Sequence, residues 1–64
     1  MTEKELLYLE DAINHETNTI DICTFIKDSL EDDELSSFIA KEIKKHESIK
    51  EKLLNVMEEL ANEW

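Results

Sequence analysis

The chain has 64 residues, no Gly and no Pro, and 17 acidic residues against 7 basic ones, which gives a formal net charge of −10 at pH 7. A chain this short forms one small domain, residues 1–64, and by itself buries only a marginal core. Its acidic charge repels phosphates, which argues against nucleic acids and anionic membrane surfaces as partners, and no run approaches the roughly 20 apolar residues of a membrane span.

The N-terminal half predicts one long helix over about residues 3–31. Thr2, followed three residues later by Glu5, matches a capping box, which places the start of the helix at about residue 3. From there one stripe of residues recurs at alternating spacings of three and four, as in a helix that buries one side. The stripe consists of Leu6, Leu9, Ile13, Glu16, Ile20, Cys23, Lys27 and Leu30.

Four consecutive acids, residues 31–34, interrupt this pattern and predict a turn. Asp32 is the expected N-cap of a second helix over about residues 33–63, because acidic residues favour a helix N-terminus. Since the turn is short, the two helices must form an antiparallel hairpin, and the fold class is all-α. We expect Trp64 to cap the open end of the bundle. The second stripe consists of Leu35, Ile39, Glu42, His46, Ile49, Leu53, Val56 or Met57, Leu60 and Trp64.

Both helices also carry apolar residues beside their stripes, and a lone hairpin has no third element to cover them. Pairing two hairpins would bury these residues in an antiparallel four-helix bundle, so the sequence predicts a homodimer or a higher oligomer built from dimers. The residues concerned are Ile22, Phe25, Ile26, Phe38, Ile43, Leu54 and Ala61.

Glu16, Glu42 and His46 occupy stripe positions where apolar residues are expected. Counted back from the acidic turn, Glu16 lies level with His46, and Glu42 lies about one helical turn closer to the acidic residues. We therefore expect the three side chains to meet across the hairpin. Burial of ionisable groups is unfavourable unless they are paired, hydrogen-bonded or bound to metal. Either these residues form a polar cluster that sets the helix register, or they form a metal site.

Two segments, KELLYLEDAINHE at residues 4–16 and DELSSF at residues 33–38, precede a His-containing second helix. Together they resemble the small helical proteins of the spore coat F type, which belong to the ferritin-like group and occur in spore-forming Firmicutes. Di-iron proteins of that group supply a Glu from one helix and a Glu-x-x-His motif from its partner helix. Glu16 matches the first of these, but His46 stands in the place of the second Glu and Ile49 in the place of the His. Glu42 and His46 still share one helix face.

Three functional interpretations follow. The first is a non-enzymatic structural or assembly protein, which the resemblance associates with spores. The second is a small ferritin-like metal binder in which Glu16, Glu42 and His46 hold Fe, Zn or Mn across the dimer. The third is an acidic adaptor for a basic protein. An enzyme is not expected, because the chain has no Gly-rich phosphate loop, no Cys-x-x-Cys and no His-Glu-x-x-His.

Two further features bear on the location of the protein. Cys23 is the single cysteine, so no disulfide forms within the chain, which fits a reducing compartment. The N-terminal residues do not resemble a signal peptide, since only a four-residue apolar run follows them. The sequence therefore predicts a cytoplasmic protein, and the resemblance implies an association with the spore coat or forespore.

Overall fold

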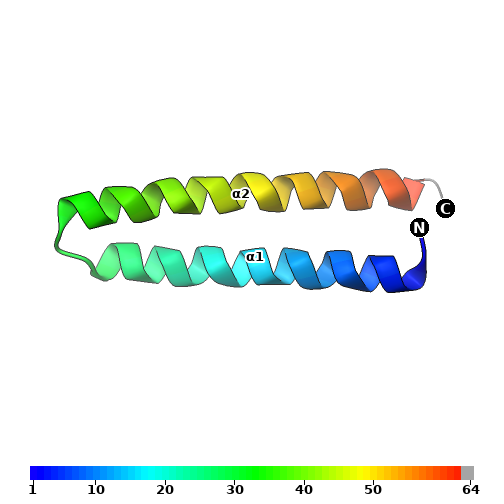
Figure 1. Ribbon diagram of the computed structural model, residues 1–64, viewed down its shortest axis with the longest axis horizontal. Helices are drawn as coiled ribbons and strands as arrows, with labels where there is room; N and C mark the ends of the chain where they lie inside the picture. Colours follow the sequence, from blue (N-terminus) through cyan, green and yellow to red (C-terminus); the bar gives the residue numbers. More distant parts are fainter. Residues whose placement is uncertain (63–64) are drawn as a thin grey trace.

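The protein is a hairpin of two long antiparallel helices, α1 (Glu3–Ser29) and α2 (Asp33–Asn62). The computed structural model describes residues 1–62. The helices lie side by side along their whole length, and the N-terminus and the last turn of α2 lie at the end opposite the hairpin turn (Figure 1). The Cα atoms extend over 48 × 15 × 10 Å. The predicted all-α hairpin is confirmed.

The predicted capping box at the start of α1 is confirmed. The backbone N–H of Thr2 donates to Glu5 Oε1 over 2.9 Å, and the backbone N–H of Glu5 donates to Thr2 Oγ1 over 3.1 Å. The hydrogen bond from the Thr2 backbone, followed by that from its side chain, holds the pKa of Glu5 below its ordinary value of 4.5. The stabilisation from ionised Glu5 is therefore present above pH 4.5 and is lost as the pH falls through the lowered pKa.

The turn begins earlier than the sequence predicted. α1 ends at Ser29 and not at residue 31, because Leu30 adopts an extended conformation with φ −82° and ψ 139°. Three residues outside the helices reverse the chain, and Ser36 Oγ then donates to the Lys27 carbonyl over 3.2 Å. The Lys27 carbonyl also accepts from the Leu30 backbone N–H over 3.4 Å, so one of the last carbonyls of α1 is satisfied at the turn.

The start of α2 agrees with the prediction, since the Leu35 backbone N–H donates to Asp32 Oδ1 over 3.0 Å. This is the geometry of an N-cap. The predicted end at residue 63 and the predicted capping role of Trp64 lie outside the described residues.

The predicted stripes face each other across the hairpin. All eight stripe residues of α1 are half-buried. On α2 one described stripe residue, Leu35, departs from the prediction. Leu35 was expected on the stripe but is 52% exposed in the first turn of α2. Met57 is half-buried while Val56 is 43% exposed, so Met57 holds the position that the spacing left open.

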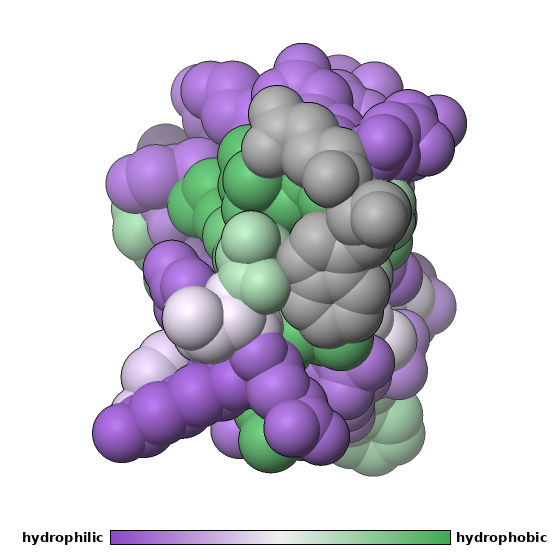
Figure 2. All heavy atoms as spheres, turned by 90° about the vertical axis from the view of Figure 1, so that its right-hand side faces the viewer, coloured by the Kyte–Doolittle hydropathy of each residue, from purple (hydrophilic) through white to green (hydrophobic). Residues whose placement is uncertain are grey.

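No residue among the described 1–62 is fully buried. Seen from the end that carries the termini, hydrophobic residues gather in the middle of the molecule and hydrophilic ones surround them (Figure 2). Many large apolar side chains nevertheless remain open to solvent. These are Leu7, Tyr8, Ile22, Phe25, Ile26, Leu35, Phe38, Leu54 and Val56.

The N-cap of α2 provides a test of this local structure. Asp32→Ala removes the acceptor of the Leu35 N–H, and we expect the free energy of unfolding to fall by about 1 kcal/mol. Glu31→Ala is the matched control, because it removes the same charge from the turn without removing a cap. Urea denaturation followed by circular dichroism measures both variants at one protein concentration, and equal losses would contradict the assigned cap.

Candidate functional site: the Glu16–His46 pair

The middle of the hairpin carries one polar contact between the helices. Glu16 comes from α1 and His46 from α2, and Glu16 Oε2 lies 2.5 Å from His46 Nδ1. Their side chains are 13% and 28% exposed, respectively. Of the predicted meeting of Glu16, Glu42 and His46 across the hairpin, the contact between Glu16 and His46 is confirmed.

The chemistry of the two groups assigns their roles in this contact. An ionised carboxylate only accepts hydrogen bonds, so the His46 ring donates through Nδ1–H to Glu16. When the ring is neutral, Nε2 then carries the free lone pair. In metal sites a carboxylate often orients a ligating histidine in this way, through the nitrogen that does not bind the metal. The arrangement therefore makes Glu16 a partner that orients His46.

Glu42, the third predicted site residue, does not join this pair. It is half-buried one helical turn before His46, and the structure of residues 1–62 gives it no hydrogen bond or ion pair. Over the same residues, no group of three or more His, Cys, Asp or Glu side chains is placed to hold a metal ion. Within one chain the described site therefore consists of two side chains.

The second histidine of the chain and its cysteine also lie on α1. His15 is exposed, and its carbonyl accepts a hydrogen bond from Thr19 Oγ1 over 2.9 Å. Cys23 is a free, half-buried thiol on the stripe, two turns from Glu16 toward the hairpin turn. Neither residue adds a side chain to the Glu16–His46 pair.

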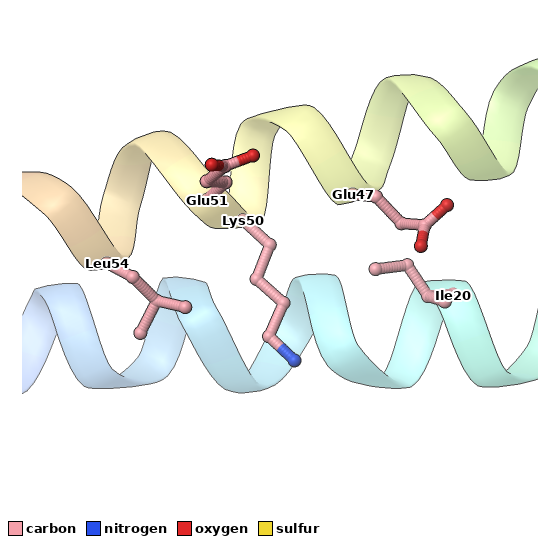
Figure 3. Close-up of a pocket in the computed structure, with 5 residues that line it drawn as sticks. All are labelled: Ile20, Glu47, Lys50, Glu51 and Leu54. Carbon is pink, nitrogen blue, oxygen red and sulfur yellow. The ribbon is translucent and has the colours of Figure 1, made fainter.

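One face of the hairpin carries an open pocket of about 340 Å³ that sequence reasoning did not identify. Lys50 and Leu54 extend from α2 toward α1, while Ile20 lies on α1 below Glu47 (Figure 3). Glu51 completes the lining. Lys50 follows His46 by four residues, so its spacing could have placed it beside the stripe. The lining combines charged ends with aliphatic walls and includes no hydroxyl, thiol or imidazole.

Comparisons of the chain with protein families, with curated proteins and with solved structures found no match. Within residues 1–62, neither helix has the apolar length that crossing a bilayer requires.

The Glu16–His46 contact predicts an unequal response to single and double substitution. His46→Leu leaves the Glu16 carboxylate mostly buried without a partner, and we expect the free energy of unfolding to fall by about 1–2 kcal/mol. In Glu16→Leu/His46→Leu both polar groups are replaced by apolar ones, and we expect the stability to return to at least that of the parent chain. Thermal unfolding at matched concentration measures this, and a double variant less stable than His46→Leu would show the expectation to be wrong.

Proposed function

We propose that this chain is a non-enzymatic structural or assembly module that acts as a homodimeric four-helix bundle. The observation that carries the proposal is the absence of any fully buried residue among residues 1–62, together with the many large apolar side chains open to solvent. Burial of apolar surface is the main favourable term in folding, and a single hairpin leaves much of its apolar surface exposed to solvent.

The exposed area supports one further copy as the missing cover. The hairpin exposes 5091 Å², whereas a compact monomer of 7.5 kDa exposes only about 4,200 Å². The excess is close to the roughly 800 Å² that each partner contributes to a standard protein–protein interface. A second hairpin of equal length offers a self-complementary surface of this size.

The exposed apolar residues favour one face of the hairpin. Both helices are right-handed, and they run antiparallel. Residues that are rotated away from the helix–helix contact in the same direction, counted along each chain from N to C, therefore lie on the same face of the hairpin. Ile20, Lys50 and Leu54 line one pocket and so mark the first face. The opposite face, here called the apolar face, carries exposed Tyr8, Ile22, Ile26, Phe38 and Val56.

The absence of an enzymatic role is part of the proposal. Catalysis needs a cleft that holds substrate beside positioned acid, base or nucleophile groups. The Glu16–His46 pair lies in the narrow contact between two helices, and the pocket at Lys50 is open and has no hydroxyl, thiol or imidazole in its lining. The resemblance to spore coat F-type proteins supports an association with the spore as the setting for such a module.

Sedimentation equilibrium at micromolar concentration tests the dimer. We expect a mass of about 15 kDa, twice that of the 7.5 kDa chain. Ile22→Lys places a charge on the apolar face and should weaken the dimer at least tenfold. Leu7→Lys is the matched control, because Leu7 is similarly exposed but is displaced from the stripe in the opposite rotational sense, toward the first face. A folded monomer of the parent chain would contradict the proposal and favour the adaptor interpretation.

A metal-binding role is the second candidate, and the Glu16–His46 contact favours it. Carboxylate and imidazole groups together suit Fe, Zn or Mn. Two donor groups per chain are fewer than the four ligands of a structural zinc site, so the second copy of the pair, or Glu42, would have to complete the set. The residues fit such a site only in the dimer.

The metal-binding role is tested by incubating the protein with Fe(II), Zn(II) or Mn(II), separating the dimer by size-exclusion chromatography and measuring its metal content by elemental analysis. We expect His46→Ala to abolish metal uptake while helicity is largely retained, because His46 supplies the nitrogen ligand. His15→Ala is the matched control, since it removes an exposed histidine from the same chain. Unchanged uptake in His46→Ala would eliminate the metal-binding role.

A further inference from the structure

We infer that the two hairpins of the dimer lie with their turns at the same end, so that α1 of each copy packs against α2 of the other. This inference rests on the proposed dimer. Two hairpins that meet through the same face are related by a two-fold axis in the interface. An axis parallel to the helices places both turns at one end and α1 against the partner's α2. An axis perpendicular to the helices places the turns at opposite ends and packs each helix against its own copy.

Charge is divided unequally between the two helices. α1 (Glu3–Ser29) contains seven acidic and two basic residues, a net charge of −5, whereas α2 (Asp33–Asn62) contains seven acidic and five basic ones, a net charge of −2. All five lysines of α2 fall within residues 41–52, where only three acids accompany them. Packing α1 against α1 of the other copy therefore brings together the two most acidic segments, while packing α1 against α2 avoids this.

The register of the hairpin places individual charges at the same level. Glu16 contacts His46, and Ser36 bonds to Lys27, so residues whose numbers add to about 62 or 63 lie level with one another. Continued toward the chain ends, this register places residue 4 level with 58–59 and residue 11 level with 51–52. A two-fold axis parallel to the helices keeps these levels between the copies.

The edges of the apolar face carry matching charges. Lys4 and Asp11 lie four residues before and three residues after Tyr8, so both lie near Tyr8 on α1, and Lys4 Nζ is 5.8 Å from the centre of the Tyr8 ring. On α2, a lysine and a glutamate flank Val56 at the same two spacings, at positions 52 and 59. With turns at the same end, Lys4 meets Glu59 of the partner subunit, and Asp11 meets Lys52 of the partner subunit.

The opposite arrangement places like charges together. When the two hairpins overlap fully with their turns at opposite ends, residue 52 lies level with about residues 40–43 of the other copy. Lys52 then meets Lys41 of the partner subunit, and the two copies of Lys45 lie within about one turn of each other. Like charges at such positions destabilise, whereas the same-end arrangement pairs opposite charges at both edges.

Charge reversal at Lys52 separates the two arrangements, because its effect has opposite signs in them. With turns at the same end, Lys52→Glu sets a glutamate against Asp11 at two symmetric places, and we expect the dimer dissociation constant to rise on the order of tenfold at low salt. The double variant Asp11→Lys/Lys52→Glu restores opposite charges and should recover most of this loss. With turns at opposite ends, Lys52→Glu alone would instead tighten the dimer, since it would meet Lys41.

Distances between spin labels give a measurement that does not depend on affinity. In a Cys23→Ala background, a label at Ser29→Cys lies about 13 residues from the middle of α1. At 1.5 Å per residue, turns at opposite ends separate the two labels by about 40 Å along the helix, whereas turns at the same end leave them less than about 30 Å apart. A label at Asn14→Cys, near the middle of α1, is the matched control because both arrangements keep it close to its copy.

The outcomes separate this inference from the proposed function. A dimer with short Ser29 distances and a weakened, rescuable Lys52→Glu variant supports both. A dimer with Ser29 distances near 40 Å, or one that Lys52→Glu tightens, overturns the same-end arrangement and leaves the dimer intact. A monomeric parent chain at micromolar concentration overturns both.

Discussion

Two helices packed side by side touch along only one strip, and this limit governs the rest of the structure. A third or fourth helix is needed to enclose a side chain on all sides, so even the stripe residues of this hairpin stay partly accessible. The stabilisation that other small domains draw from a closed core is therefore incomplete here. The hairpin exposes more surface than a compact monomer of its mass, and this excess is about the area that one further hairpin of the same kind would cover.

The Glu16–His46 contact adds specificity to a strip that is otherwise largely apolar. Apolar side chains pack acceptably in several registers, because dispersion and hydrophobic contacts have little directional preference. A carboxylate and an imidazole at mid-helix satisfy each other in only one register, since a slip of one turn leaves both without a partner. The same pair is the place where a metal could be bound, so the structural and the metal-binding interpretations concern the same two residues.

Electrostatics extends this argument from one hairpin to the proposed pair of hairpins. A strongly acidic α1 and an α2 whose basic residues cluster near its middle make the two helices unequal, although both are amphipathic and similar in length. Hydrophobic faces alone permit either orientation of a dimer, whereas charges along their edges favour one orientation and penalise the other. In the proposed dimer, the acidity of α1 therefore acts on the choice of packing partner.

Much of the hairpin could be predicted from the sequence, because helix periodicity, the Thr2–Glu5 capping box and the Asp32 cap depend on neighbours within a few residues. Counting residues in both directions from the predicted turn also placed Glu16 level with His46. The tertiary structure decided what depends on contacts between the helices: the end of α1 at Ser29, the exposure of Leu35 in the first turn of α2, and the separation of Glu42 from the Glu16–His46 pair. The two kinds of information differ because spacing fixes which side of a helix a residue occupies, whereas only the packed helices fix which side chains come within bonding distance.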